Sequence, residues 1–394
     1  MPAVCFYFQV HQPRRLRRYR LFDIGKERAY FEDSSETNLN NRKVLEKVSR
    51  KCYLPANAIF LKLLKRFPEL RLSFSFSGVF LDQLEEFAPE TLSSFQRLVQ
   101  TGQVEILAET YYHSLSSLYS RDEFRNQINL HAKKIKNLFH QTPKIFRNTE
   151  LIYQNDLAEE IENMGYLGTL CEGVDHILGW RSPNFLYSPP HSKLKLMLKN
   201  YGLSDDIAFR FSSRDWSEWP LSAPKFASWI SALNGNGEVV NLFMDYETFG
   251  EHQWGETGIF DFLEALPGEI LKNKENSFIT PSQAICSFET RGIYDAPHYI
   301  SWADVERDLS AWRSNKMQES ALENVYSLQG AVYAKNDPEL LETWRRLQTS
   351  DHFYYMCTKW WSDGDVHKYF NPYQSPYEAF ISFMNVLNDV KLRL

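Results

Sequence analysis

The sequence predicts a parallel α/β barrel followed by a helical C-terminal region, and three observations support this fold class. Apolar segments of strand length alternate with segments of helical periodicity, which is typical of repeated βαβ units. About seven candidate strands precede residue 250. Beyond residue 300 the strand signals stop and helical patterns remain. The number of strands favours a barrel, although an open doubly wound sheet would show the same alternation.

The strands and helices of the first part of the chain follow in regular order. The first strand, 4–10, is apolar and aromatic and stops at Pro13, which has no amide hydrogen to give to a sheet. Further strands are expected at 72–80, 104–108, 145–147, 166–171, 207–211 and 239–245. Helices are expected between them at 56–66, 89–99, 121–139 and 155–164, where the apolar residues recur with helical spacing.

The chain beyond residue 300 is expected to be helical, with helices at 302–327, 338–348 and 376–390. Asp337 before Pro338 is a strong helix start, because aspartate caps the first turn and proline needs no amide partner there. No repeat or low-complexity linker separates this part from the rest. We therefore expect a barrel over residues 1–299 and a helical region over residues 300–394 that packs on the barrel.

The charge balance argues against a nucleic-acid-binding protein. The formal net charge is −6, and the densest basic stretch, 14–20, holds five arginines. A nucleic-acid groove usually needs a wider basic face, so a solvated loop or a local anion contact explains this stretch better. Aromatic residues make up 15% of the chain. This surplus suits sugar binding, but large aromatic cores account for most of these residues.

Cysteine spacing and hydropathy argue against further classes of protein. Five cysteines are scattered without a CxxC pair, which disfavours both a zinc knuckle and a disulfide framework. The N-terminus has an apolar run, but it lacks the charged start and small-residue cleavage site of a signal peptide. No apolar stretch approaches the roughly 20 residues that cross a bilayer. We therefore expect a cytoplasmic protein without a membrane partner.

Polar residues follow the predicted strands at the points where the strands end. They are His11, Glu105, Glu109, Glu150, Glu172 and Asp245, with His252 shortly after. The active site of a parallel barrel lies at the carboxyl ends of its strands. Carboxylates after successive strands suit two chemistries, namely glycoside cleavage by a pair of acids and a metal site built from Asp and His.

Histidine spacing favours glycoside cleavage over the metal site. The histidines are isolated and no HxxxH pair occurs, whereas metal sites usually take paired histidines. Plain structural roles also compete with function, since an acid at a strand end often caps a helix. Trp254 and Trp302 are equally well explained as sugar platforms or as core residues. The residues alone do not choose between Glu150 and Glu172 as a nucleophile.

Five motifs in order resemble glycoside hydrolase family 57, specifically its α-amylase-like branch. The motifs are HQP at 11–13, GQVEIL at 102–107, CEGVD at 171–175, MDYETFG at 244–250, and SWAD at 301–304 with DLSAW at 308–312. HQP is short and weakly specific, but the MDYETFG string in order with the others is a strong signal. The resemblance covers essentially the whole chain.

The resemblance implies an incomplete (β/α)7 barrel with a helical C-terminal region, retaining chemistry, and no obligatory metal or other cofactor. It places the nucleophile at Glu172 and the general acid/base at Asp245. The residues expected to contact the sugar, with the tryptophan of the fifth motif included, are His11, Glu105, His252, Trp254 and Trp302.

The expected function is cleavage of α-glucosidic bonds in an α-glucan or maltooligosaccharide. Glu172 would attack the anomeric carbon while protonated Asp245 donates to the departing oxygen. The third motif departs from its form in the glucanotransferases of the family, which leaves 4-α-glucanotransferase activity as an alternative on the same scaffold. A metal-dependent polysaccharide deacetylase and a non-catalytic α-glucan-binding protein are rivals from other classes.

Overall fold

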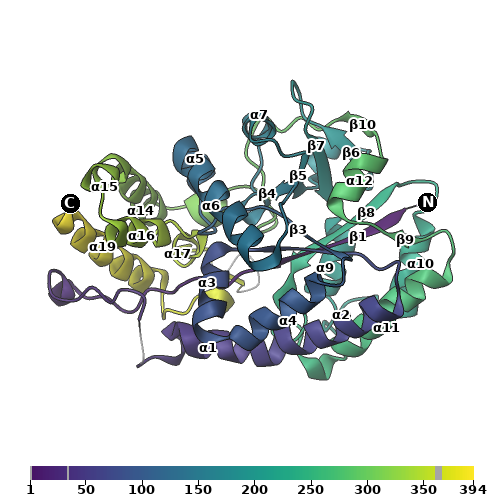
Figure 1. The fold of residues 1–394 in the computed structure, drawn as a ribbon, viewed down its shortest axis with the longest axis horizontal. Coiled ribbons are helices and arrows are strands. Elements are labelled where there is room, and N and C mark those ends of the chain that lie inside the picture. Colours follow the sequence, from purple (N-terminus) through teal and green to yellow (C-terminus); the bar gives the residue numbers. More distant parts are fainter. Residues whose placement is uncertain (1, 33–34, 360–365) are drawn as a thin grey trace.

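The computed structural model describes residues 2–32, 35–359 and 366–394 (Figure 1). The strands within these residues form two sheets of five strands each. They are β1 (Ala3–Val10), β2 (Leu72–Phe76), β3 (Val104–Ile106), β4 (Ile145–Arg147), β5 (Gly168–Glu172), β6 (Leu186–Ser188), β7 (Lys195–Lys199), β8 (Val239–Asp245), β9 (Ser277–Phe278) and β10 (Thr290–Ile293). The structure is therefore an α/β fold, as expected.

The first sheet has the order β3-β2-β1-β8, and β9 pairs with β1. All of its pairings are parallel. Every residue of β1 is buried, as expected for a strand with neighbours on both edges and covered faces. Gln9 of β1 aligns with both Ser75 of β2 and Asp245 of β8, so these strands end together.

The second sheet has the order β10-β6-β7-β5-β4, in which only the β6–β7 pairing is antiparallel. Its edges approach those of the first sheet. Ala108, just after β3, forms a parallel bridge with Phe146 of β4, and the Asn200 amide after β7 donates to Asn241 of β8 over 2.9 Å. Among the described residues these contacts do not extend into one closed sheet.

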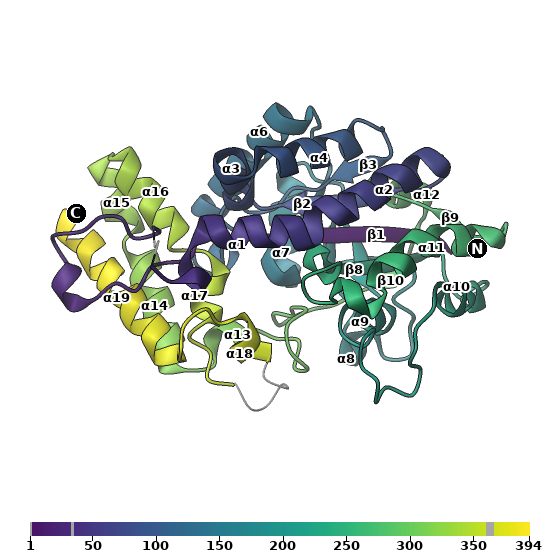
Figure 2. The ribbon, with the colours of Figure 1, turned by 90° about the horizontal axis from the view of Figure 1, so that it is seen from below.

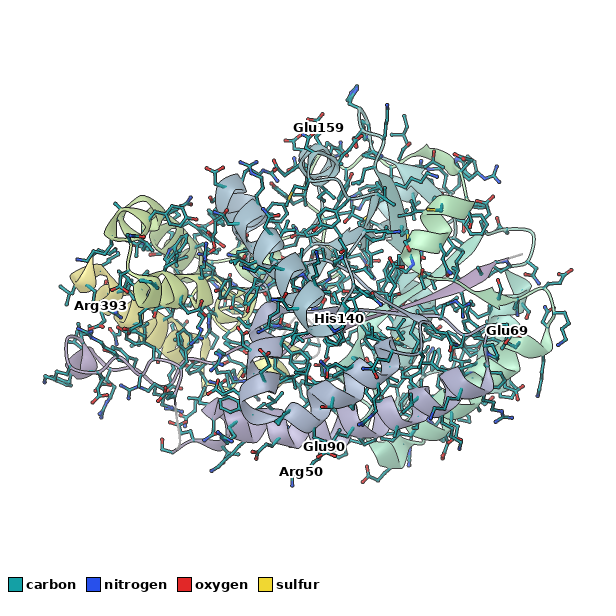
Figure 3. All side chains as sticks on the ribbon, in the orientation of Figure 1. Arg50, Glu69, Glu90, His140, Glu159 and Arg393 are labelled. Carbon is teal, nitrogen blue, oxygen red and sulfur yellow. The ribbon has the colours of Figure 1, made fainter. Side chains whose placement is uncertain are left out.

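Helices cover the sheets, and α2 and α11 run along β1 (Figure 2). The helices up to residue 287 are α1 (Asn41–Val48), α2 (Leu54–Arg66), α3 (Gly78–Phe87), α4 (Pro89–Val99), α5 (Ser116–Tyr119), α6 (Arg121–Phe139), α7 (Asn155–Asn163), α8 (Asp175–Leu178), α9 (Tyr201–Ala208), α10 (Ala223–Ala232), α11 (Ile259–Lys272) and α12 (Pro281–Ser287). They are amphipathic. In α7, for example, Leu157 and Ile161 are buried while Glu159 points outward, as do Arg50 and Glu90 elsewhere (Figure 3).

Aromatic packing beneath the first sheet sets the direction of the side chains at the end of β8. The Phe8 ring centroid lies 5.5 Å from that of Phe74 and 5.4 Å from that of Tyr246. Tyr246 is fully buried, and its hydroxyl donates to Asn57 over 2.6 Å. Because neighbouring side chains on an extended chain point opposite ways, Tyr246 in the core leaves Asp245 to face away from it.

The chain beyond residue 300 is helical, with α13 (Ser310–Arg313), α14 (Lys316–Ser327), α15 (Gln329–Lys335), α16 (Pro338–Arg346), α17 (Ser350–Tyr354), α18 (Val366–Phe370) and α19 (Pro376–Arg393). Trp312, Trp344 and Phe383 belong to their shared core. Leu16 and Leu39, from the segment after β1, belong to the same core, and Figure 2 shows this N-terminal segment beside α19. The division of the chain at residue 299 stays a prediction. The segment after β1, from the first part of the chain, packs in the core of the second.

Several predicted boundaries were wrong. Residues 207 and 208 of the expected strand at 207–211 instead end α9, and residues 209–211 form a turn, because the Asn200 side chain accepts from the Leu203 amide and caps a helix there. The expected strand at 72–80 ends at Phe76, because Ser77 caps α3. The expected helix at 302–327 is two helices, α13 and α14, and residues 302–309 before them are not helical. In the described part of the chain no helix combines the length and apolar composition needed to cross a membrane.

Gly250, the last residue of the MDYETFG motif, offers a site at which the fold can be tested. Its φ is +114°, and an added Cβ would lie 2.1 Å from the Lys51 carbonyl oxygen. We expect Gly250→Ala to lower the free energy of unfolding by more than about 1 kcal/mol, measured by urea denaturation. Gly330→Ala, in α15 with open space around it, is the matched control and should be neutral or slightly stabilising. Equal stability of the two variants would contradict this account.

Candidate active site

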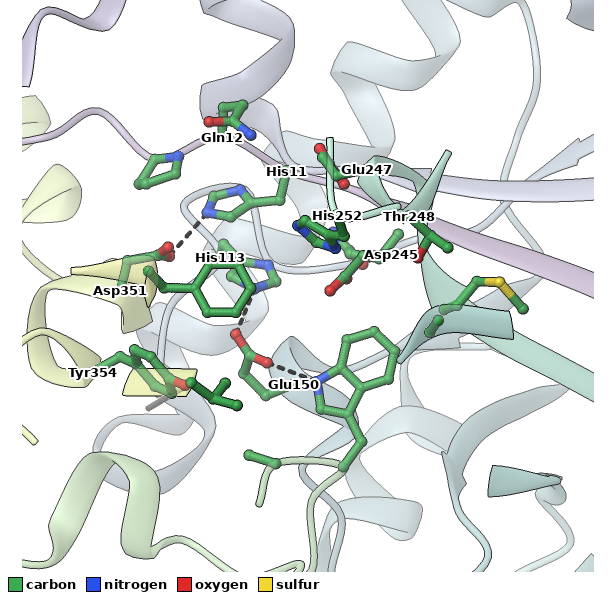
Figure 4. Close-up of a pocket in the computed structure, with 18 of the residues that line it drawn as sticks. His11, Gln12, His113, Glu150, Asp245, Glu247, Thr248, His252, Asp351 and Tyr354 are labelled. Atoms are coloured by element: carbon green, nitrogen blue, oxygen red, sulfur yellow. Dashed lines mark hydrogen bonds and ion pairs between the residues drawn. The ribbon is translucent and has the colours of Figure 1, made fainter. Parts of the chain in front are cut away.

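A cavity of about 250 Å³ lies where the carboxyl ends of β1 and β8 meet the C-terminal helices (Figure 4). Its carboxylates are Glu150, Asp245, Glu247, Asp304 and Asp351. Its rings are His11, His113, Phe209, Phe243, His252, Trp302, Tyr354, Tyr355 and Phe370. A cavity lined by both acidic groups and aromatic rings suits a sugar, whose hydroxyls and apolar faces need both.

Glu150 and Asp245 both face this cavity (Figure 4). Asp245 is the last residue of β8, and Glu150 lies in a short 3₁₀ turn, Thr149–Leu151, that follows β4. Glu150 has φ +57°, a left-handed conformation that is costly for a residue with a side chain. The Trp302 amide donates to the Glu150 carbonyl over 3.1 Å and helps to hold this turn.

Two ring N–H groups hold the Glu150 carboxylate. His113 Nε2 lies 3.1 Å from Oε1, and Trp302 Nε1 donates to Oε2 over 2.7 Å. The His113 ring is fixed from its other side by Glu109, whose Oε2 lies 3.0 Å from Nδ1. Glu109 and His113 lie four residues apart, so two chain segments, theirs and that of Trp302, hold the Glu150 carboxylate.

The protonation states in this cluster follow from its contacts. Burial alone would lower the pKa of His113, but its bonds to Glu109 and Glu150 outweigh burial and raise the pKa to about 9. The ring is therefore cationic at neutral pH, and both nitrogens donate. Burial alone would raise the pKa of Glu150, but the hydrogen bond and charge of His113, with the charge of Arg147, lower it. Glu150 is thus held ionised.

The pKa of Asp245 is shifted in the opposite direction. Burial, and then the negative charge of Glu150, raise its pKa to about 6, and the charges of Arg147 and His113 only partly offset them. Its neighbour Glu247 also faces the cavity, and burial, with Asp245 as the next cause, raises the pKa of Glu247 to about 8. Of these three carboxylates, Glu150 favours its charged form, whereas Asp245 and Glu247 take up a proton more readily than usual.

His11, His252 and Trp302 line the cavity, as the sequence led us to expect. His11 Nδ1 lies 2.6 Å from Ser77 Oγ and its Nε2 lies 3.0 Å from Asp351 Oδ2. Its ring stacks on His113 with centroids 4.0 Å apart. Burial lowers the pKa of His252 to about 4, so that ring is neutral and can both give and accept a hydrogen bond.

Glu172, expected as the nucleophile, is not among the described residues that line the cavity. Its side chain is fully buried at the end of β5. Oε2 lies 2.8 Å from Arg307 Nη1 and 3.7 Å from Lys199 Nζ. Burial nevertheless raises its pKa. The structure thus places Glu172 beside two cations and outside the described lining of the cavity, and its role as nucleophile stays a prediction.

Glu105 and Trp254 are also absent from the described lining of the cavity. Glu105 lies within β3, and its Oε2 accepts from the Ser282 amide at the start of α12 over 3.0 Å. Trp254 is 58% exposed, and Lys51 Nζ lies 5.4 Å from its ring centroid. Their expected contacts with a sugar stay predictions.

Sequence reasoning missed three residues of the site as catalytic candidates, namely Glu109, His113 and Asp351, and left Glu150 as an open alternative to Glu172. Glu109 and Glu150 are both acids that follow predicted strands, and His113 is an isolated histidine in the sequence. Asp351 carried no signal, because it comes from α17 in the C-terminal region. Within residues 2–32, 35–359 and 366–394, no three or more His, Cys, Asp or Glu side chains form a candidate metal site.

Comparisons with known proteins agree with the motifs. The family described as Glycosyl hydrolase family 57 matches residues 5–297. A putative α-amylase of Methanocaldococcus jannaschii is 43% identical, over 98% of this chain and 83% of its own length. A 4-α-glucanotransferase of Thermococcus litoralis is 21% identical, over 64% of this chain and 38% of its own length.

Solved structures show the same fold at low sequence identity. The T. litoralis 4-α-glucanotransferase superimposes with a TM-score of 0.66 at 18% identity, over 89% of this chain and 56% of that one. An α-amylase of Thermotoga maritima gives a TM-score of 0.63 at 13% identity, over all of this chain and 93% of that one. From the family match and the 43% identity to a relative of nearly equal extent, the chain belongs to glycoside hydrolase family 57.

Proposed function

We propose that this protein cleaves α-glucosidic bonds of an α-glucan with retention, using Glu150 as the nucleophile and Asp245 as the general acid/base. The observation that carries the proposal is the opposite direction of the pKa shifts of two carboxylates facing one cavity. Glu150 has a lowered pKa, and Asp245 has a pKa raised to about 6. A retaining glycosidase needs such a pair, with one acid ionised and the other protonated. The relatives named as α-amylase and 4-α-glucanotransferase support an α-glucan as substrate.

The proposed reaction has two steps. Glu150 attacks the anomeric carbon while Asp245 gives its proton to the departing glycosidic oxygen. The glycosyl-enzyme ester is then cleaved by water, whose proton Asp245 takes. His113 and Trp302 keep their hydrogen bonds to the two Glu150 oxygens, orient the nucleophile for attack, and stabilise its charge again when it leaves.

The incomplete barrel expected from the motifs is part of this proposal. We infer that the strands β8, β1, β2, β3, β4, β5 and β7 together make up its wall. The bridge between Ala108 and Phe146 on one side, and the bond from Asn200 to Asn241 on the other, support this arrangement. It directs the carboxyl ends of β1, β4 and β8 toward one cavity, as the active sites of barrels require.

Carboxamide variants test the catalytic assignment. Incubated with maltooligosaccharides, the wild type should release shorter products, and Glu150→Gln and Asp245→Asn should each lose on the order of 10³-fold or more in kcat. Glu172→Gln should still cleave. Chromatographic sizing also separates the two reactions, because longer products appearing with the shorter ones mean transfer to a sugar acceptor. Loss of cleavage in Glu172→Gln with retention in Glu150→Gln would contradict the proposal.

The pH dependence tests Asp245 separately. Because the acid must be protonated in the first step, kcat/KM on maltooligosaccharides should fall as pH rises through about 6. An aryl maltooligosaccharide with a good leaving group needs no acid in this step. On that substrate Asp245→Asn should retain activity and lose the alkaline limb. An alkaline limb that persists unchanged in Asp245→Asn would show that another group titrates.

A further inference from the structure

Glu172, although outside the cavity, lies at the centre of a buried ion cluster. Its Oε2 lies 2.8 Å from Arg307 Nη1 and 3.7 Å from Lys199 Nζ. Asp205 closes the cluster, with Oδ1 2.9 Å from Lys199 Nζ and Oδ2 3.7 Å from Arg307 Nη2. Two acids thus face two bases, so the cluster is electrically balanced. Buried ion pairs of this kind are weak contributors to stability but fix geometry where it matters.

Both cations of the cluster are connected to Trp302, Lys199 by contact with its ring and Arg307 through the backbone of the same loop. Lys199 Nζ lies 5.5 Å from the centroid of its ring, within the range of a cation–π contact. Arg307 belongs to the loop that carries Trp302. The amide of Ser301 donates to the Arg307 carbonyl over 3.0 Å and closes this loop at its base. The Arg307 guanidinium also lies 3.9 Å above the Tyr201 ring, which limits its freedom further.

The backbone of the loop needs these anchors. Asp304 and Arg307 have φ values of +54° and +51°, which is unfavourable for residues with side chains. Asp304 is held by His367, whose Nε2 lies 3.0 Å from its carboxylate. Arg307 is held by Glu172. The loop therefore has one anchor on the C-terminal helices and one beneath the cavity, and the first keeps the loop attached when the second is removed.

We propose that Glu172 is a positioning residue for the nucleophile, acting through Arg307, Lys199 and Trp302. It fixes the two cations, the cations fix the Trp302 indole, and the indole N–H bonds Glu150 Oε2 over 2.7 Å. This inference rests on the proposed role of Glu150. In this role Glu172, the glutamate of the CEGVD motif, needs no contact with the sugar.

The kinetic test compares Glu172→Gln and Arg307→Gln with Trp302→Phe. Each should lower kcat by about tenfold or more, with KM changed by less than about threefold. Each should also move the acid limb of the kcat/KM profile to higher pH, because Glu150 loses a hydrogen bond that favours its charged form. Glu172→Gln added to Trp302→Phe should move the limb no further, since both changes remove the same bond.

A spectroscopic test does not depend on activity. The indole N–H resonance of Trp302, assigned by its loss in Trp302→Phe, should exchange slowly with solvent in the wild type. It should exchange at least about tenfold faster in Glu172→Gln and Arg307→Gln. Glu123→Gln is the matched control. It breaks another buried ion pair, in which Arg345 Nε donates to Glu123 Oε1 over 2.9 Å, and should lower stability without moving this resonance or the acid limb.

The outcomes separate this inference from the proposed function. Unchanged Trp302 exchange and an unchanged acid limb in Glu172→Gln and Arg307→Gln would overturn the positioning role, even when Glu150→Gln is inactive. An additive shift in the double variant would overturn it as well. If Glu150→Gln remains active while Trp302 exchange responds as expected, then Glu172 positions the loop as described and it is the assignment of the nucleophile that fails.

Discussion

The hydrogen bond between the cationic His113 ring and Glu150, 3.1 Å long, is the interaction on which the active site depends. A carboxylate taken from water needs hydrogen bonds and opposite charge to stay ionised. His113 supplies both because Glu109 holds its ring from behind, and the Trp302 indole supplies a second bond. Glu109 and His113 follow β3, Glu150 follows β4 and Trp302 lies on the loop after β10, so the two sheets and this loop must be assembled before Glu150 can act as a nucleophile.

Burial raises the pKa of both Glu150 and Asp245, and their different contacts then set the two pKa values apart. Asp245 has His113 and Arg147 only as distant charges, and the negative charge of Glu150 reinforces the effect of burial. Glu150 has two direct donors that reverse that effect. Opposite pKa shifts of two acids thus arise in a single cavity, although burial acts on both in the same direction. The packing of Tyr246 into the core completes the arrangement, since it directs Asp245 toward the cavity.

Much of the fold followed from the sequence, because alternating strand and helix periods and cap residues are local signals. The regular strands β1, β4 and β8 and the helix α6 lie where expected, and His11, Asp245 and Trp302 reach the cavity. The choice between Glu150 and Glu172 did not follow. Both acids come after strands, and only their three-dimensional partners differ, with Arg307 and Lys199 enclosing Glu172. Motif order could not reveal that enclosure, because Arg307 lies on a loop remote from β5.

Identification of the carboxylate that becomes covalently attached to sugar tests the account most directly. A fluorinated α-glucosyl fluoride forms the ester with the nucleophile but slows its hydrolysis, so the labelled peptide can be isolated after proteolysis and sequenced by mass spectrometry. The account predicts one glycosyl group on Glu150, and no labelling in Glu150→Gln. A glycosyl group on Glu172, or labelling that persists in Glu150→Gln, would contradict it.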